Sequence, residues 1–325
     1  MTLTRRNFIA GSTLSLSSTK LWSQTGDIVQ IEGPAFGARW RAILPLGIDA
    51  ALIASKVGSI IKSVDSTMSP FNPTSEISMF NSNQTTRLQR VSAGILTTVN
   101  EAKRTAQFTQ GAFDPTLGGV VGRYGFGPIN SAPVGAFKDL AVSRAGLQKS
   151  QPQQTLDLCG IAKGFALDQI ATTLTDLGYN DYFVELGGEV FARGFHPDRR
   201  PWMAGIERPV AGQRTLQRTI PVNNEVLATS GDLVNSYRHA NQRYSHIIDP
   251  HTQHPTNNAL ASVSVFAPRA ITADALATAL FAMGPQIGFA FAQDYEIPAM
   301  FLVRDQRGLQ EMLTDNFSAR ESGKI

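Results

Sequence analysis

Cysteine is nearly absent from this sequence. The chain has 325 residues and a single cysteine, Cys159. An intramolecular disulfide framework and a zinc site with several thiolate ligands are therefore excluded. Cys159 also lies far from the N-terminus, so it does not occupy the position of a lipid-anchored cysteine after an export signal.

An excess of charge is also absent once the N-terminal segment is set aside. The chain has 29 Lys and Arg against 26 Asp and Glu. The three surplus basic residues, Arg5, Arg6 and Lys20, all lie in the first 24 positions, so the remaining chain has no formal net charge. The composition therefore gives no reason to expect binding to nucleic acid or general adhesion to a membrane surface.

Linker-like runs and internal repeats are absent as well. With 42% hydrophobic residues, the chain can bury a large core. We therefore expect residues 25–325 to form a single compact, two-lobed domain.

The first 24 residues have the pattern of an export signal. Residues 4–9 read TRRNFI, a twin-arginine pattern, and a mildly apolar stretch interrupted by serine and threonine follows. This stretch is too short and polar to span a bilayer, which needs roughly 20 apolar residues, and no transmembrane segment is expected. We expect residues 1–24 to be a signal peptide cleaved near residues 22–24, and the mature protein to be exported to the periplasm. The alternative is a frayed basic N-terminus.

Helical and strand patterns do not alternate regularly along the chain. Apolar spacing predicts helices at residues 48–67, 91–109, 161–177 and 272–284. A hairpin or two short strands is expected at 27–46, on either side of Gly33 and Pro34, and loops are expected at 69–76 and, around a short helix, at 111–128. Further strands are predicted at 182–186, 189–193, 202–206, 218–222, 244–248, 261–266 and 298–303. Without βαβ repeats, this order predicts an α+β fold with mixed or antiparallel sheets packed with helices.

Asp274 and Thr278 lie four positions apart on the predicted helix at 272–284. Their oxygen-bearing side chains should project from one face, about one turn apart. Such a pair suits a hard cation such as Mg²⁺, which takes few protein ligands. The alternative is an ordinary amphipathic helix with Thr272 as its N-cap and two solvated polar residues.

Residues 156–168 (LDLCGIAKGFALD) run from a short strand through a glycine turn into a helix. Backbone N–H groups at such a helix start form an anion site, and Gly160 would let a phosphate approach closely. Asp157 could bind a ligand or orient the loop, and Lys163 could add positive charge. A tight turn without a ligand explains the pattern equally well.

A second polar group of residues combines 227–232 (LATSGD) with 243–250 (RYSHIIDP). His246 could take a proton from an attacking hydroxyl, because the ordinary pKa of histidine is close to neutral pH. It could equally be a buried histidine with a structural hydrogen bond. Thr229 and Ser230 could bind phosphate, or they could cap a helix that Asp232 begins.

Six segments together identify the chain as similar to the ApbE family, the FAD:protein FMN transferases. They occur in the family's order and cover nearly all of residues 25–325. The segments are 33–40, 68–81, 111–128, 156–168 with 184–194, 227–232 with 244–250, and 273–284.

The resemblance implies roles that the residues themselves only permit. Asp274 and Thr278 correspond to the family's Mg²⁺ ligands. Gly160 corresponds to the residue whose backbone carbonyl completes the set of ligands that the protein supplies to the ion. Asp157 corresponds to a flavin-contacting aspartate, and His246 to the histidine proposed to act in transfer. Other positions implied to contact or adjoin FAD are Ala112, Phe113, Asp114, Glu185, Gly187 and Gly188.

Three positions depart from the family pattern. Phe36 stands where methionine is usual, and Phe71 where tyrosine is usual, both in positions implied to lie against the flavin. Phenylalanine keeps an apolar stacking surface but lacks the tyrosine hydroxyl. Cys159 replaces glycine or another small residue beside the phosphate turn.

The implied activity is Mg²⁺-dependent transfer of FMN from FAD to a Thr or Ser hydroxyl of an acceptor protein, with release of AMP. The implied fold is ApbE-like and T-fold-like. Two alternatives remain open at this point: hydrolysis of FAD to FMN and AMP at the same site, and a non-catalytic FAD-binding flavoprotein of the periplasm.

Overall fold

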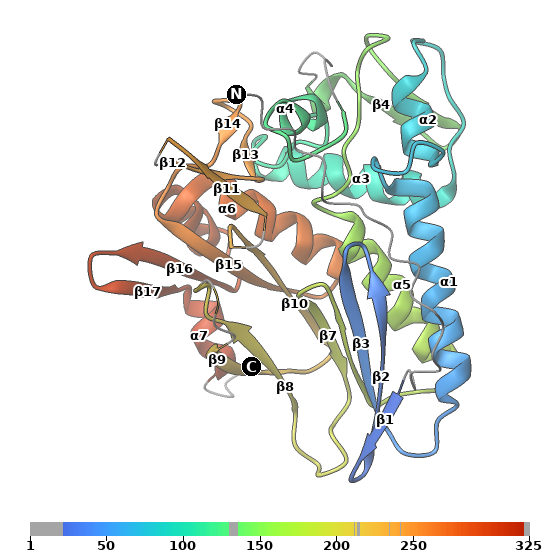
Figure 1. Cartoon of the computed structure of the whole chain (residues 1–325), viewed down its shortest axis with the longest axis vertical. Helices are drawn as coiled ribbons and strands as arrows, with labels where there is room; N and C mark the ends of the chain where they lie inside the picture. Colours follow the sequence, from blue (N-terminus) through green and yellow to red (C-terminus); the bar gives the residue numbers. More distant parts are fainter. Residues whose placement is uncertain are drawn as a thin grey trace.

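A nine-stranded antiparallel sheet runs through the molecule (Figure 1). The computed structural model describes residues 22–129, 136–210, 212, 215–233, 235–240 and 242–321, so most of the expected signal segment lies outside the described residues. In spatial order the strands are β1 (Trp22–Thr25), β2 (Ile28–Ala35), β3 (Ala38–Pro45), β6 (Tyr182–Leu186), β7 (Glu189–Arg193), β10 (Glu225–Gly231), β15 (Leu260–Ala267), β16 (Ala299–Asp305) and β17 (Gly308–Leu313).

Four two-stranded sheets and the helices complete the described fold. The small sheets are β4 (Ala141–Ser143) with β5 (Gly146–Gln148), β8 (Trp202–Glu207) with β9 (Leu216–Val222), β11 (Ser236–His239) with β12 (Gln242–Ser245), and β13 (Ile248–Asp249) with β14 (His254–Pro255). The helices are α1 (Ala50–Met68), α2 (Glu76–Ser82), α3 (Ala93–Phe108), α4 (Gly118–Arg123), α5 (Ala162–Asp176), α6 (Ala270–Asp294) and α7 (Asp315–Glu321), with a short 3₁₀ turn at Phe137–Asp139. The predicted α+β class with antiparallel sheets is confirmed.

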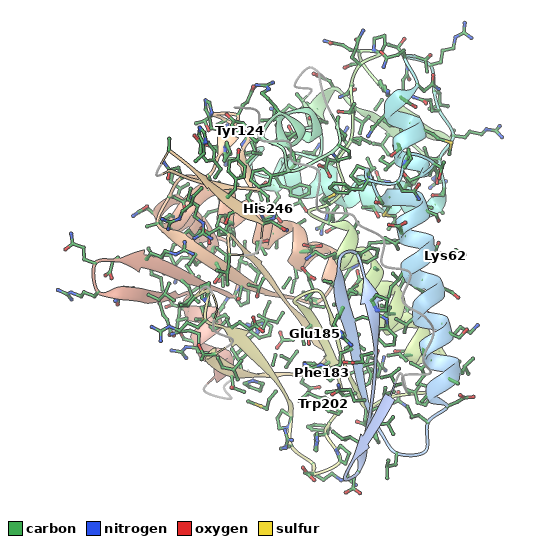
Figure 2. The ribbon with its side chains drawn as sticks, viewed as in Figure 1. Lys62, Tyr124, Phe183, Glu185, Trp202 and His246 are labelled. Atoms are coloured by element: carbon green, nitrogen blue, oxygen red, sulfur yellow. The ribbon has the colours of Figure 1, made fainter. Side chains whose placement is uncertain are left out.

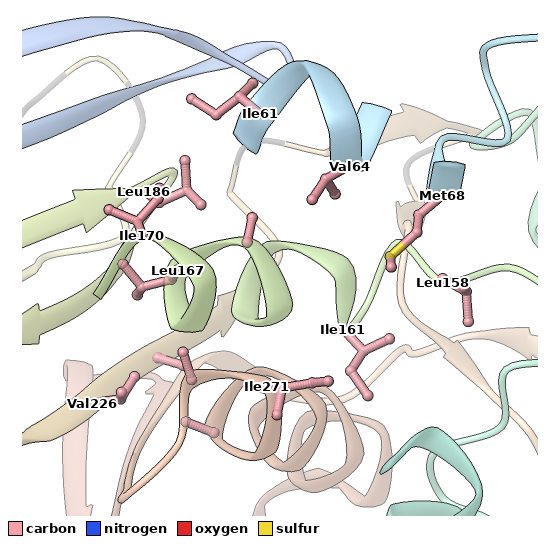
Figure 3. Close-up of a cluster of buried hydrophobic side chains, with 14 of the residues drawn as sticks. Ile61, Val64, Met68, Leu158, Ile161, Leu167, Ile170, Leu186, Val226 and Ile271 are labelled. Atoms are coloured by element: carbon pink, nitrogen blue, oxygen red, sulfur yellow. The ribbon is translucent and has the colours of Figure 1, made fainter. Parts of the chain in front are cut away.

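The large sheet has a core on each face, because successive residues of a strand point to opposite sides. On one face, α5 lies between α1 and α6, and the three helices bury an apolar layer that includes Leu158, Ile161 and Ile271 (Figure 3). On the other face, Phe183 and Leu227 pack with strands β8 and β9 and with Phe317 of α7. The helical face is the one that carries the polar residues described below.

Several sequence predictions differ from the structure in detail. The β2–β3 turn is at Phe36 and Gly37, both with positive φ, and not at Gly33 and Pro34. Strands β10 and β17 and helix α2 were not predicted. No helix begins at Asp232, which directly follows β10. The strand expected at 244–248 is interrupted, and His246 lies at a bend between β12 and β13.

Helix α6 is longer than predicted and begins differently. It extends to Asp294, with a break at Gly284 before Pro285. Its N-cap position is Arg269 and not Thr272. Among the described residues, α6 is the one helix whose length and composition would allow it to cross a membrane, and 61% of its most apolar window is buried inside the protein.

Candidate active site

Asp274 joins α6 to the start of α5. Its side chain is buried, and Oδ2 accepts a hydrogen bond of 2.9 Å from the backbone N–H of Gly164. The two helices can approach this closely because Gly164 has no side chain: a Cβ there would lie 2.3 Å from the Ala270 carbonyl oxygen. Asp168 completes the junction by accepting from the N–H groups of Ala270 (2.7 Å) and Ile271 (3.3 Å) at the first turn of α6. Asp274 is therefore not a solvated residue of an amphipathic helix.

Thr278 and Gly160 also meet at this junction. A Cβ on Gly160 would lie 3.4 Å from Thr278 Oγ1 and 3.3 Å from the ring of Phe113. Thr278 Oγ1 is 3.2 Å from Ser230 Oγ of β10, at hydrogen-bond distance. The structure thus brings together Gly160, Thr278, Phe113 and Asp274, which come from three distant segments of the chain.

A buried charge cluster lies beside Asp274, and one of its members, Glu189, was missed by the sequence analysis. Glu189, at the start of β7, pairs with Lys163 of α5, while its second oxygen, Oε2, is buried without a hydrogen-bond partner in the described part of the chain. Burial raises the pKa of Glu189 to about 8 against the attraction of Lys163. Burial also raises the pKa of Asp274. The sequence signal that could have revealed Glu189 is its place directly after the Gly187-Gly188 turn. Both glycines have positive φ, and the strand that follows begins with Glu189, which pairs with Lys163.

The charge on Lys163 is set by these two carboxylates. Burial alone would lower the pKa of Lys163, but Glu189 and Asp274 raise it above its ordinary value. One ammonium group therefore faces two buried carboxyl groups, which leaves a local deficit of positive charge whenever both are ionised.

A divalent cation fits this deficit and the donor set. Asp274, Thr278 and the carbonyl of Gly160 are all oxygen donors, and Mg²⁺ combines few protein ligands with water and phosphate oxygens. Within the described ranges, no group of three or more His, Cys, Asp and Glu residues could hold a metal. The site therefore suits a hard ion with a small protein share and does not suit zinc.

The segment 112–114 is packed against the glycine turn of residues 156–168. Ala112 and Phe113 are buried, and Asp157 N–H donates to the Pro115 carbonyl at 2.7 Å. Asp157 Oδ1 accepts from Cys159 N–H at 2.9 Å, so this carboxylate orients the turn.

The carboxylate of Asp114 has hydrogen-bond partners within its own loop and beyond it. Oδ1 accepts from the N–H and the hydroxyl of Thr116 at 2.8 and 2.6 Å, and Oδ2 accepts weakly from Phe137 N–H at 3.4 Å. Its burial raises its pKa. These bonds shape the loop that presents Phe113.

Phe36 and Phe71 both lie at the periphery of the fold. Phe36 is half-buried at the β2–β3 turn with φ of 49°, beside a groove of about 680 Å³ between the hairpin and α1. Phe71 precedes α2 and is 61% exposed. A smaller cavity of about 220 Å³ lies near Ala112, between the end of α3 and α6.

His246 has a fixed ring orientation. The Asn235 carbonyl accepts from the backbone N–H of His246 at 3.0 Å and lies 3.1 Å from its Nδ1. Because a carbonyl can only accept, Nδ1 carries the proton and Nε2 keeps a free lone pair. Burial lowers the pKa of His246, and the positive charge of Lys163 lowers it further, so the ring is neutral near pH 7.

The ring of His246 lies on the same side of the molecule as Tyr124, away from Glu185, Phe183 and Trp202 (Figure 2). Phe126 contacts the His246 ring edge-on, with centroids 6.3 Å apart. Glu185, by contrast, pairs with Arg41 at 2.7 Å, and it alternates along β6 with Leu186 of the helical-face core. The side chain of Glu185 therefore lies on the other face of the sheet from Asp274 and Lys163.

Thr229 and Ser230 do not cap a helix. Both belong to β10, where Thr229 Oγ1 lies 2.8 Å from Ser264 Oγ and Ser230 bonds to Thr278. Asp232, the next polar residue, forms ion pairs with Arg304 and Arg243.

Comparison with known proteins agrees with this fold. A relative from Vibrio cholerae, named FAD:protein FMN transferase, is 35% identical over 305 residues, which is 89% of this chain and 91% of the relative. The solved flavin transferase ApbE from Vibrio cholerae superposes with a TM-score of 0.81 at 33% identity, over 90% of this chain and 99% of that one. The apo form of the flavinyl transferase ApbE from Pseudomonas stutzeri superposes with a TM-score of 0.82 at 27% identity, over 92% of this chain and 98% of that one.

These likenesses define the chain as an enzyme, a transferase. The model of the ApbE family matches residues 36–301. The chain belongs to the ApbE family.

Proposed function

We propose that this protein transfers the FMN part of FAD to a Thr or Ser hydroxyl of an acceptor protein and releases AMP. The observation that carries the proposal is the junction of Gly160, Asp274 and Thr278, where buried carboxylates exceed the positive charge available. Such a site binds a cation and a phosphate together, and a pyrophosphate is the part of FAD that needs both. The relatives named FAD:protein FMN transferase support the choice of FAD.

Mg²⁺ would be held by Asp274, Thr278 and the Gly160 carbonyl. When bound, it would neutralise phosphate charge and polarise the phosphorus centre toward attack. The N–H groups at the start of α5 and the ammonium of Lys163 would add donors for the pyrophosphate.

His246 would act as the general base. Its Nε2 would accept the proton of the acceptor hydroxyl as that oxygen attacks the FMN phosphorus. A new P–O bond to the acceptor forms, and the bond from this phosphorus to the bridging oxygen breaks, so AMP leaves with that oxygen. The lowered pKa of His246 keeps the ring neutral and able to accept a proton.

Phe36, Phe71, Ala112, Phe113 and Asp157 would hold the flavin part. The half-buried ring of Phe36 and the exposed ring of Phe71 offer apolar surfaces on which an isoalloxazine could stack. Neither ring offers a hydroxyl, so polar recognition of the flavin would rest on backbone groups and on Asp157.

We also propose that the protein works in the periplasm after export by the twin-arginine route. The support is the TRRNFI pattern at residues 4–9 and the neutral charge balance of the chain that follows. Twin-arginine export carries folded proteins, which suits a large single domain.

The experiment is incubation with FAD, Mg²⁺ and a flavoprotein acceptor, followed by detection of AMP and of fluorescence that stays with the acceptor on a denaturing gel. Asp274→Asn is the informative variant, because an amide oxygen can still accept from Gly164 N–H while the negative charge is lost. We expect this variant to lose nearly all transfer. Free FMN with AMP would instead indicate hydrolysis, and FAD bound without AMP would indicate a flavin carrier. Undiminished transfer by Asp274→Asn at low Mg²⁺ would exclude the proposed metal site.

A further inference from the structure

Asp232 is a buried carboxylate that the reaction as proposed does not use. It directly follows β10 and is 5% exposed. Arg304 of β16 donates to both carboxylate oxygens of Asp232, with Nη2 2.6 Å from Oδ1 and Nη1 2.9 Å from Oδ2. A bidentate pair of this kind fixes orientation as well as distance.

Arg304 itself is anchored in the sheet. Its Nη1 also donates to the Leu260 carbonyl at 3.1 Å, and its backbone N–H donates to the Ala259 carbonyl at 2.7 Å. Asp232 N–H in turn donates to the Ala261 carbonyl at 3.2 Å. The carboxylate is therefore held to β15 and β16, two neighbouring strands of the large sheet.

The same residue holds the chain that leads into His246. Arg243, on β12, lies with its Nε 3.2 Å from Asp232 Oδ2, and its Nη2 donates to the Asp232 backbone carbonyl. His246 follows three residues later. The Asn235 carbonyl, three residues after Asp232, accepts the N–H and the Nδ1–H of His246. Arg243, which precedes the ring, and His246 itself are thus tied to the segment that Asp232 anchors.

Ser230 connects this segment to the candidate metal site. It stands two residues before Asp232 on the same strand, and its hydroxyl bonds to Thr278. Ser230 therefore contacts Thr278, and Asn235, five residues later, contacts His246. Because Ser230 belongs to β10, the large sheet fixes the first of these contacts.

We propose that Asp232, fixed by Arg304 and Arg243, is a positioning residue that sets the place and the ring tautomer of His246. The inference rests on the proposed function for the role of His246 in transfer, but the geometry of the ring can be tested without it. Residues that orient the histidine ligands of metal sites are typically worth about 10- to 100-fold in activity or affinity, and we expect a factor of the same order here.

The test uses the full-length protein with Asp232→Asn, Arg304→Gln and the double variant. Glu311→Gln is the matched control, since Glu311 of β17 is also held by an arginine, Arg218 of β9. Three quantities are measured on each preparation: the ¹⁵N spectrum of the His246 ring without FAD, FAD affinity, and the FMN transfer rate at saturating FAD. The His246 signals are assigned by their loss in His246→Gln.

We expect the wild-type ring to be protonated at Nδ1. Asp232→Asn and Arg304→Gln should each show a mixture of tautomers. Transfer should fall about 10- to 100-fold while FAD affinity stays unchanged. The double variant should be no worse than the worse single variant, because both act on one unit. Glu311→Gln should resemble wild type in all three measurements.

An unchanged tautomer and rate in Asp232→Asn and Arg304→Gln would overturn the proposal, and so would loss of the folded state in both. A wild type with the expected ring spectrum, disturbed in Asp232→Asn, but with no FMN transfer to any acceptor would contradict the proposed function and leave the positioning role standing.

Discussion

At the scale of single residues, the most informative is His246, because its two possible roles predict different losses. Its Nδ1–H bond to Asn235 is of the kind that a structural histidine would make, yet the ring is only partly buried and its Nε2 has no partner among the described residues. An unused nitrogen on a fixed, neutral ring is what a general base requires.

His246→Gln tests this role with little change in volume, because the glutamine amide can still donate to the Asn235 carbonyl. General-base assistance is typically worth about 10²–10⁴ in rate, so transfer should fall by that factor while FAD affinity and the melting temperature change little. A fall in melting temperature that accounts for the loss of rate would instead assign a structural role to the ring.

The lowered pKa of His246 predicts how the transfer rate and the stability of the protein depend on pH. Burial is the main cause, and it makes the folded protein bind this proton less tightly than the unfolded chain, whose histidine pKa is near 6.5. Transfer should therefore stay high below pH 6.5 and decline only as the pH falls through the lower folded value. The same group should contribute stability above pH 6.5 that is lost on acidification. A profile of kcat/KM against pH with its acid limb at or above 6.5 would contradict the neutral-ring assignment.

The sequence located most of the candidate residues but not the partners that fix them. The spacing of Asp274 and Thr278 is visible along one helix, so it could be read directly. The pairing of Lys163 with Glu189, and of Asp274 with Gly164, joins segments from different parts of the chain, and only the tertiary packing reveals it. The face of the sheet on which Glu185 lies could not be predicted either, because a strand end by itself does not define it.

At the scale of elements, the junction of α5 and α6 decides whether the site forms. Gly164→Ala would put a Cβ 2.3 Å from the backbone oxygen of Ala270 and would push the helices apart. Overpacking of this kind typically costs about 1–3 kcal/mol, and here it would also displace Asp274. We expect a lower melting temperature together with a loss of transfer.

Gly58→Ala in α1 is the matched control for this prediction. Gly58 is exposed, and nothing lies within 4 Å of the added Cβ. Glycine in a helix costs roughly 0.5–1 kcal/mol relative to alanine, so this variant should be slightly more stable than wild type. Equal melting temperatures for the two variants would show that the close approach of α5 and α6 contributes nothing.

Elements with their own periodicity were predicted well, and those defined by their neighbours were not. Helices α1, α3 and α5 show clear apolar stripes and fall within a few residues of their predicted bounds. Strand β10 reads EVLATSG, whose short apolar start and polar end give no alternation, and it becomes a strand because β7 and β15 flank it. The N-terminus of α6 was misread because its cap is supplied by Asp168 of another helix, which no local pattern contains.

At the scale of the whole molecule, the proposed route of export can be tested independently of the catalytic site. The translocation receptor would read the guanidinium pair of Arg5 and Arg6, and lysine does not reproduce that geometry. The variant Arg5→Lys with Arg6→Lys should therefore accumulate in the cytoplasm, as measured by fractionation, with unchanged melting temperature after purification. Normal recovery from the periplasm would show that this pair is not the export signal.

The proposed cation should also stabilise the whole fold, because its ligands come from α6 and from the turn before α5. A ligand that binds only the folded state adds about 2.7 kcal/mol when its concentration is 100 times its Kd. For a chain of this size, that corresponds to a rise in melting temperature on the order of 5 °C. The rise should appear with Mg²⁺ alone, since the carboxylates that attract the ion are already buried together. Asp274→Asn should remove it, whereas Glu311→Gln, on the far strand of the sheet, should keep it. The same rise in Asp274→Asn would place the ion elsewhere in the molecule, whatever the transfer assay gave.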